Sequence, residues 1–146
     1  MHLEYKPLTV ERIAEVIPLY IDYYNTVDGS EWTEETTYKR IHQIITREDA
    51  YGLVLEVDGA VTGFAMGYFS QYDDGIVYDL SEIIIARQAQ RQGLGTIFMH
   101  ELESRVKDAG AFLIQLQAVN DAMHEDFYRK LGYGTCTNLV LKSKIL

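Results

Sequence analysis

The sequence predicts a mixed α/β fold in a single domain over residues 1–146. Apolar residues change their spacing along the chain, from the three-and-four period of helices before Ala50 to runs typical of strands after it. In the second half, two apolar strands over residues 76–86 and 112–118 are joined by a helical segment, and such crossovers connect parallel neighbours. These observations predict a mixed central sheet with an N-terminal antiparallel meander, a β-α-β crossover and helices on both faces.

The first predicted elements are a short strand over residues 3–7 and a helix that follows it. Thr9 is placed to cap the start of this helix. Pro18 falls inside the helical pattern, where proline lacks a backbone donor and collides with the preceding turn, so we expect a kink or a break. The helical stripe consists of five apolar or aromatic side chains: Ile13, Val16, Ile17, Tyr20 and Tyr24.

A second helix is predicted from Thr33 to about Arg47. Thr33 is a favourable cap, and Glu34 and Glu35 place negative charge in the first turn, next to the positive end of the helix dipole. The expected apolar face consists of Tyr38, Ile41 and Ile45.

Three strands of an antiparallel meander are predicted next. Residues 50–57 and 60 to about 71 flank Asp58-Gly59, a dipeptide favoured in tight hairpin turns. A second reversal at residues 73–75 leads into the strand over residues 76–86. This strand ends in three isoleucines, a run typical of strands covered on both faces, so we expect it inside the sheet.

The rest of the chain predicts two helices and two strands. A helix from Thr96 to about Ala109 ends at Gly110 and leads into the strand over residues 112–118. A last helix over residues 122–131 has an apolar stripe formed by Met123, Phe127 and Leu131. A terminal strand around residues 139–144 closes the chain, and its open edge is the reason to consider a homodimer.

Composition and charge narrow the class of protein. Thirteen Lys and Arg against 22 Asp and Glu give a net charge of −9, which disfavours nucleic acid and anionic membranes as partners. The single cysteine, Cys136, permits no internal disulfide, and no cluster has zinc-ligand spacing. The N-terminus lacks an apolar signal core, and no apolar run approaches the roughly 18 residues of a membrane span. We therefore expect a cytoplasmic protein without a metal.

The most informative segment runs over residues 83–96, from the apolar strand through a glycine loop into a helix start. Gly93 and Gly95 allow positive φ and close backbone approach, and the free N–H groups of a first helical turn attract phosphate. Arg87 and Arg91 add positive charge, and residues 83–100 contain no Asp or Glu. The segment therefore predicts an anion-binding loop.

Other interpretations of this loop fit less well. A dinucleotide-binding fold needs a third glycine in G-x-G-x-x-G, where this chain has Phe98, and the Gly-Lys-Ser/Thr of a Walker loop is absent. In a purely structural interpretation, the glycines only end the strand and begin the helix. The acid-free run and the buried strand before it favour a ligand.

Two motifs resemble one family. Gln90-x-x-Gly93-x-Gly95 after a strand resembles the Q/R-x-x-G-x-G/A acyl-CoA signature of the GNAT superfamily of N-acetyltransferases. Residues 127–133, Phe-Tyr-Arg-Lys-Leu-Gly-Tyr, resemble the later F-Y-x-x-L-G-F segment of that family, and the order of elements matches along nearly the whole chain. The resemblance implies a GNAT-like fold.

The sequence departs from the family pattern at two positions. Arg87 stands where a proline is frequent. Asp121 stands where an asparagine is frequent, and Asn120 beside it is assigned to the cofactor site.

The resemblance implies acetyl-CoA as co-substrate. Main-chain amides of Ile83 and Ile85, where the fourth and fifth strands splay, would pair with the pantetheine arm. Coenzyme A carries roughly four negative charges, which suits an acid-free loop in an acidic protein. Its pyrophosphate would be held by the amides of Arg91, Gln92, Gly93, Leu94, Gly95 and Thr96.

The resemblance also implies Tyr128 as the general acid of acyl transfer. A tyrosine with its ordinary pKa of about 10 is protonated at neutral pH and can donate to a thiolate whose conjugate acid has a pKa near 8.5. Tyr128 is one of eleven tyrosines, so a packing role is the alternative. Asp79 and Glu82 are the candidate bases, on opposite faces of their strand unless a bulge intervenes. A water relay without a single base stays open.

The acceptor site in such a fold would be walled by the early helices and their loop. Aromatic rings with a carboxylate suit a cationic amine. Tyr20 and Tyr24 belong to the helical stripe and are expected in the core. The candidates for acceptor binding are Tyr23, Glu31, Trp32 and His124.

Together the motifs predict an acetyl-CoA-dependent N-acetyltransferase. We expect it to acetylate a primary amine of a small molecule or peptide by direct attack in a ternary complex, because no cysteine lies in the motifs to carry the acyl group. The alternative is a non-catalytic acyl-CoA-binding or regulatory domain of the same fold.

Overall fold

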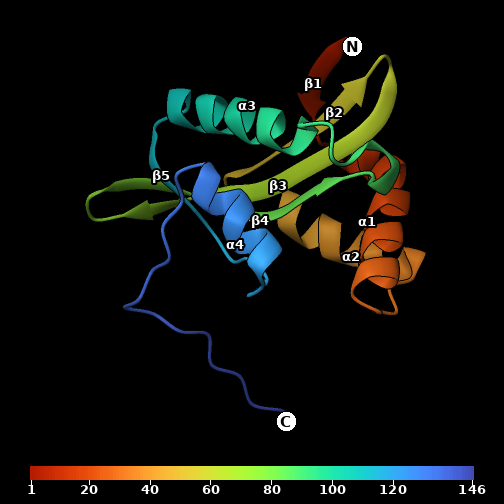
Figure 1. The fold of residues 1–146 in the computed structure, drawn as a ribbon. Helices are drawn as coiled ribbons and strands as arrows, with labels where there is room; N and C mark the ends of the chain where they lie inside the picture. The colour runs from red at the N-terminus through yellow and green to blue at the C-terminus, as the bar shows by residue number, and fades with distance from the viewer.

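A five-stranded sheet forms the centre of the computed structural model, which describes residues 1–146 (Figure 1). The first four strands are antiparallel, and the fifth is parallel to the fourth, so the predicted meander and crossover are confirmed. The strand expected inside the sheet, β4, has neighbours on both sides. In chain order and in sheet order, the strands are β1 (Leu3–Pro7), β2 (Ala50–Val57), β3 (Ala60–Tyr72), β4 (Gly75–Ile85) and β5 (Ala111–Leu116).

Helices cover both faces of the sheet, as predicted. They are α1 (Ile13–Val27), α2 (Glu34–Ile45), α3 (Leu94–Asp108) and α4 (Ala122–Lys130), with two 3-10 turns at Val10–Arg12 and Arg87–Ala89. Helices α1 and α2 pack on one face around Tyr20, Ile41 and Phe64. Helix α3 packs on the other face, where Phe98 and Leu102 meet the core, and α4 lies against the same cluster. Two separate cores therefore hold the sheet between them.

The sequence predicts a kink or a break at Pro18, and helix α1 runs through Pro18 without a break. Thr9 also forms no side-chain cap, because a 3-10 turn lies between it and the helix. The helix persists because its side chains at Ile13, Val16 and Tyr20 are almost completely buried. Burial of this face outweighs the loss of one backbone hydrogen bond at the proline.

Helix α2 begins where predicted and turns most of the predicted face to the core. Thr33 accepts a hydrogen bond from the Thr36 amide at 3.1 Å, and the Thr33 amide donates to the Thr36 hydroxyl at 3.0 Å, which forms a capping box. The buried side chains are Thr37, Ile41 and Ile44, whereas Tyr38 is 43% exposed. Of the predicted face, Ile41 is buried and Ile45 packs partly buried against the same core, so only Tyr38 is wrong, because a tyrosine can stay at the surface.

The C-terminal predictions are partly wrong. No strand forms at residues 139–144: after Tyr133 the chain runs away from the rest of the domain, and every residue from 134 to 146 is exposed (Figure 1). A strand needs a neighbour for its backbone hydrogen bonds, and this segment does not lie against another strand. Met123 is 64% exposed, and α4 packs through Phe127 instead.

Candidate active site

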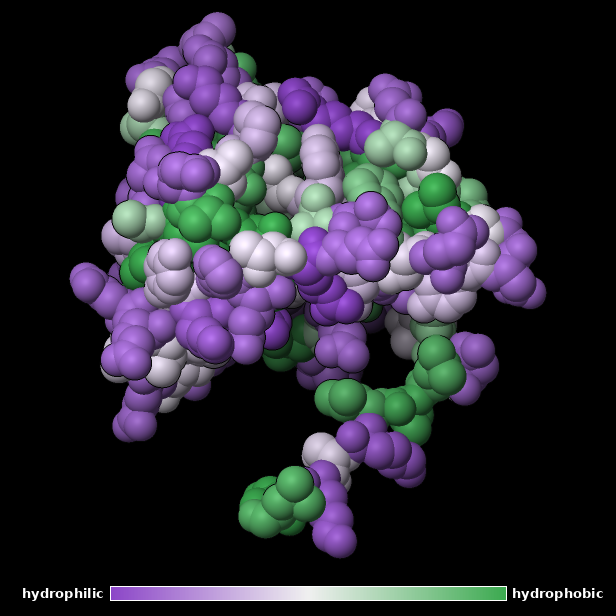
Figure 2. All heavy atoms as spheres, turned by 180° about the vertical axis from the view of Figure 1, so that it is seen from behind, coloured by the Kyte–Doolittle hydropathy of each residue, from purple (hydrophilic) through white to green (hydrophobic).

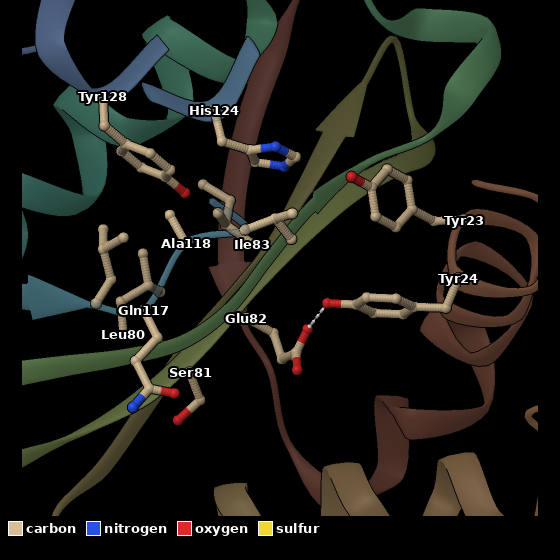
Figure 3. A pocket seen from close by; sticks show the side chains of 12 residues that line it. Tyr23, Tyr24, Leu80, Ser81, Glu82, Ile83, Gln117, Ala118, His124 and Tyr128 are labelled. Carbon is tan, nitrogen blue, oxygen red and sulfur yellow. Dashed lines mark hydrogen bonds between the residues drawn. The ribbon is translucent and has the colours of Figure 1, made fainter. Parts of the chain in front are cut away.

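A pocket opens where β4 and β5 separate. Pairing between these strands ends at Leu80 and Leu116, and β4 continues to Ile85 without β5 beside it. The walls come from α1, β4, the end of β5 and α4 (Figure 3). The lining residues are Tyr23, Tyr24, Leu80, Ser81, Glu82, Ile83, Leu116, Gln117, Ala118, Val119, His124 and Tyr128.

A bulge in β4 directs Glu82 toward this pocket. Glu82 pairs with Met66 and Leu80 pairs with Gly67, which leaves Ser81 as an extra residue between two pairs. Asp79 pairs with Tyr68, two residues from Met66 on β3, so Asp79 and Glu82 emerge from the same face of the sheet. The alternation that would separate the two carboxylates is thus cancelled by the bulge.

Only one of the two candidate bases lines the pocket. Asp79 lies outside it, where its carboxylate accepts hydrogen bonds from the Ser70 hydroxyl at 2.7 Å and from the Gln115 amide at 2.5 Å. Glu82 lines the pocket. The geometry therefore favours Glu82 over Asp79 as the group that meets an acceptor amine.

Glu82 is held by two side chains from different helices. Its side chain is 7% exposed; the Tyr24 hydroxyl of α1 donates to Oε2, and the Arg40 guanidinium of α2 donates to Oε1 at 3.2 Å. Burial raises the pKa of Glu82 above its ordinary value, although the bonds from Tyr24 and Arg40 act against this rise. A carboxylate with a raised pKa is a stronger base than an exposed glutamate.

Tyr128 faces this carboxylate from the opposite wall. Figure 3 shows the Tyr128 hydroxyl pointing into the pocket from α4, with Glu82 and Tyr24 on the far side. Burial raises the pKa of Tyr128, and the charges of Tyr23 and Glu82 add to the rise, so its hydroxyl is protonated at neutral pH. The ring packs against Phe127 and Tyr133 at centroid distances of 5.0 and 5.6 Å, which fixes its direction.

His124 lies one turn before Tyr128 and also lines the pocket. The Asp121 carboxylate caps α4 by accepting from the His124 amide at 2.8 Å, and it contacts the ring Nδ1 at 2.8 Å. A proton on Nδ1 satisfies this contact and leaves Nε2 as an acceptor toward the pocket. The aspartate that departs from the family pattern therefore orients the histidine.

The predicted acceptor residues divide into two groups. Tyr23 and His124 line the pocket. Trp32 packs edge-on against Tyr20 at 5.0 Å, and its backbone is held by the Asn25 side chain at 2.9 Å, so it closes the core between α1 and α2. Glu31 is exposed in the same loop and does not line the pocket.

Sequence reasoning missed three members of the site. Tyr24 has the spacing of a core residue, and its ring does pack on Tyr20 at 4.7 Å, but its hydroxyl reaches Glu82. Arg40 carries no local signal, because it meets Glu82 across 42 residues of sequence. Gln117 follows β5 at the pocket wall, where a break in strand pairing is the only clue.

The glycine loop presents six consecutive free amides. None of the main-chain nitrogens of residues 91–96 donates to a protein acceptor, and the last three belong to the first turn of α3. Arg91 and Gly93 both adopt positive φ, at 64° and 78°, which turns the chain sharply before the helix. Free amides at a helix N-terminus with no acid in the first turn are the donors that an anion-binding site needs.

Two details of this loop differ from the prediction. Gly95 is helical and not at positive φ; a Cβ there would meet the Phe127 ring at 3.4 Å, so Gly95 lets α4 approach closely. Arg87 pairs with Asp22 at 2.7 and 3.0 Å, which neutralises its charge. Asp22 lies 65 residues away on α1, so no local pattern could reveal this pair.

Other features lie outside the pocket. Asn120 lies in the exposed turn before α4 and does not line the pocket.

Nowhere do three or more His, Cys, Asp or Glu side chains gather as metal ligands would. None of the helices has both the length and the apolar composition that a bilayer crossing requires.

Solved structures with the same fold include acetyltransferases. A possible acetyltransferase from Clostridium difficile 630 superposes with a TM-score of 0.84 at 12% identity, covering 100% of this chain and 99% of that one. An aminoglycoside acetyltransferase from an uncultured soil metagenomic sample, in complex with sisomicin, has a TM-score of 0.75 at 18% identity, with 99% and 96% covered. An aminoglycoside N-acetyltransferase in complex with CoA has a TM-score of 0.75 at 13% identity, with 98% and 95% covered.

Sequence comparison assigns the family directly. No curated protein is similar enough in sequence to count as a relative. The family model described as Acetyltransferase (GNAT) family matches residues 13–133, which contain the glycine loop and the pocket. The chain therefore belongs to the GNAT family of acetyltransferases.

Proposed function

We propose that this protein transfers the acetyl group of acetyl-CoA to a primary amine of a small molecule, by direct attack in a ternary complex. One observation carries the proposal: the six free amides of residues 91–96 follow β4 after one 3-10 turn, and the splayed end of β4 forms a pocket with Glu82 and Tyr128 on opposite walls. An anion site next to an acid–base pair suits a charged acyl carrier and an amine.

The residues present fit coenzyme A. The amides of residues 91–96 would hold its pyrophosphate, since they have no acceptor of their own. The part of β4 beyond Leu80, which includes Ile83 and Ile85, has no strand on its β5 side and would pair with the pantetheine arm. When bound, acetyl-CoA supplies a thioester as the acyl donor.

Glu82 and Tyr128 would move the two protons of the reaction. An alkylammonium with a pKa of about 10.4 must lose a proton before its nitrogen can attack, and Glu82 accepts it directly or through water. As the new C–N bond forms, the nitrogen releases its second proton to water. As the C–S bond breaks, the Tyr128 hydroxyl donates a proton to the departing sulfur and is then reprotonated from water. Cys136, the one cysteine, is exposed in the C-terminal tail, so no thiol in the pocket is available to carry the acetyl group.

The pocket wall suits a cationic acceptor. Tyr23, Tyr24 and His124 surround the buried carboxylate of Glu82, and rings beside a carboxylate attract an ammonium group. Two of the similar structures are aminoglycoside acetyltransferases, one of them in complex with sisomicin, so aminoglycosides are the first acceptors to test.

The proposal is tested by measuring coenzyme A release with acetyl-CoA and a panel of amines. The panel contains aminoglycosides, polyamines, amino acids and short peptides, and Tyr128→Phe and Glu82→Gln serve as matched variants. We expect turnover on at least one amine, lost in both variants. Binding of acetyl-CoA without turnover on any amine would instead support a non-catalytic acyl-CoA-binding domain.

A further inference from the structure

The pocket contains a second group that can accept a proton at neutral pH, the His124 ring. Burial raises the pKa of the Tyr23, Tyr24 and Tyr128 hydroxyls, so these three groups stay protonated and act only as donors. Glu82 is the base already assigned to the first proton of the amine. The remaining lining side chains are aliphatic, hydroxyl or amide groups that do not titrate in this range. His124 is therefore the one base in the pocket without an assigned role.

Asp121 prepares this ring to accept a proton. Its carboxylate oxygen Oδ1 accepts from the His124 main-chain amide at 2.8 Å and lies 2.8 Å from the ring Nδ1. A neutral imidazole has one N–H, and with that proton on Nδ1 the other nitrogen, Nε2, is an acceptor. Once Nε2 takes up a proton, the ring is a cation, and a carboxylate at Nδ1 stabilises this charge.

His124 and Tyr128 lie one helical turn apart on the same face of α4. Side chains four residues apart on a helix are neighbours, with about 5–6 Å between their Cβ atoms. Figure 3 shows both rings entering the pocket from α4. The His124 side chain is 22% exposed, and Figure 2 shows the C-terminal residues 134–146 standing clear of the body, so they do not cover the pocket. Water can therefore reach the ring and connect it to the Tyr128 hydroxyl.

Acetylation of an alkylammonium group releases one proton that Glu82 does not accept. The nitrogen begins with three protons and keeps one in the amide product, so two protons leave it. Glu82 accepts the first, and the second leaves as the C–N bond forms. The sulfur gains a proton from Tyr128 as the C–S bond breaks, so Tyr128 must be reprotonated in every turnover. A group that accepts the second proton and returns it to Tyr128 would complete this cycle.

We propose that His124 is this proton relay. Its Nε2 accepts the second proton through water as the C–N bond forms, and returns it through water to the Tyr128 oxygen after the C–S bond breaks. The protons balance: the sulfur gains one, Glu82 passes the other to solvent, and the relay ends the turnover in its starting state. Asp121 is a positioning residue, because it acts only through His124. The inference rests on the proposed acetyl transfer.

The first experiment measures coenzyme A release from acetyl-CoA with the amine that the unaltered chain acetylates fastest. In His124→Ala, kcat should fall by about 100-fold, the lower end of the range for an acid–base group, while calorimetry gives an unchanged coenzyme A affinity. Added imidazole should restore much of this rate, because it can occupy the space of the missing ring and accept the proton. A ring with only a packing role would give no such rescue.

His100→Ala is the matched control for this experiment. His100 also lies on a helix and faces an acid three residues later, Glu103 at 3.3 Å, but it is exposed on α3 and does not line the pocket. This variant should keep its activity and should not respond to imidazole. Full activity in His124→Ala, or a loss that imidazole does not restore, would overturn the relay and leave the proposed acetyl transfer standing. No turnover by the unaltered chain would overturn both.

The second experiment tests the role of Asp121 without relying on turnover. ¹H–¹⁵N correlation spectra of the histidine rings, with the signals of His124 identified by their loss in His124→Ala, should place the proton of the neutral ring on Nδ1. Asp121→Asn keeps a favourable helix cap, so its melting temperature should not change, but it removes the charge beside Nδ1. Its kcat should fall by less than that of His124→Ala. A neutral ring with its proton on Nε2, or full activity in Asp121→Asn, would overturn the positioning role.

Discussion

Removal of Arg40 should shift the pH dependence of catalysis. Arg40 lies 3.2 Å from the Glu82 carboxylate, and an opposite charge within this range lowers a carboxyl pKa by about 1–3 units. Because the Arg40 side chain is 42% exposed, solvent screens the interaction. We therefore take the lower end of this range, a pKa difference of about one unit, which corresponds to about 1.4 kcal/mol. In Arg40→Met the pKa of Glu82 therefore rises further. Glu82 must be ionised to accept a proton, so the acidic limb of kcat/KM moves to higher pH.

The assay is coenzyme A release at saturating acetyl-CoA between about pH 5 and pH 9. We expect the acidic limb of Arg40→Met to move up by about one pH unit, with a loss of up to about tenfold on the limb and little loss on the plateau. Arg47→Met is the matched control, since Arg47 stacks on the Tyr68 ring at 3.5 Å and does not line the pocket. An unmoved limb in Arg40→Met, or an equal loss at every pH, would refute the role of Arg40 in setting the pKa of Glu82.

Three further predictions follow from single residues. Tyr128→Phe should lower kcat by about 10²–10⁴-fold while calorimetry gives an unchanged coenzyme A affinity; full activity would exclude Tyr128 as the acid. Gly95→Ala should stabilise the free protein by up to about 1 kcal/mol, because alanine has the higher helix propensity and its Cβ fits 3.4 Å from the Phe127 ring. The same change should weaken coenzyme A binding at the loop. Unchanged affinity in calorimetry would show that no ligand comes near Gly95. The Arg12 and Lys6 side chains lower the pKa of Glu56, so Glu56 stabilises the fold at a pH above its ordinary pKa, and this stability is lost as the pH falls through its folded pKa. In Glu56→Gln, the free energy of unfolding in urea should therefore fall less steeply as the pH is lowered. An unchanged dependence on pH would contradict this.

Local signals in the sequence predicted most of the fold. The Asp58-Gly59 turn has both residues at positive φ and joins β2 to β3 as expected, and Thr33 caps α2. The crossover from β4 through α3 to β5 follows from periodicity and handedness alone. These features depend on neighbours in sequence, so a pattern can reveal them.

Features that depend on contacts between distant segments could not be predicted. The Arg40–Glu82 and Arg87–Asp22 pairs join residues 42 and 65 positions apart. The bulge at Ser81 decides the direction of Glu82, and it appears only in the pairing of β3 with β4. The strand predicted at residues 139–144 was wrong, because apolar alternation alone does not form a strand unless its backbone N–H and C=O groups meet a neighbouring strand.

The proposed acetyl transfer depends most on the main-chain amides of residues 91–96, which are proposed to bind the pyrophosphate of coenzyme A. A ¹H–¹⁵N NMR titration of the full chain with coenzyme A tests this directly, and a parallel titration with pantetheine, which lacks the pyrophosphate, is the matched control. We expect coenzyme A to move the amide signals of residues 91–96 together with those of Ile83 and Ile85, and pantetheine to move only the latter pair. Unmoved signals at residues 91–96 in the presence of saturating coenzyme A would contradict the assignment.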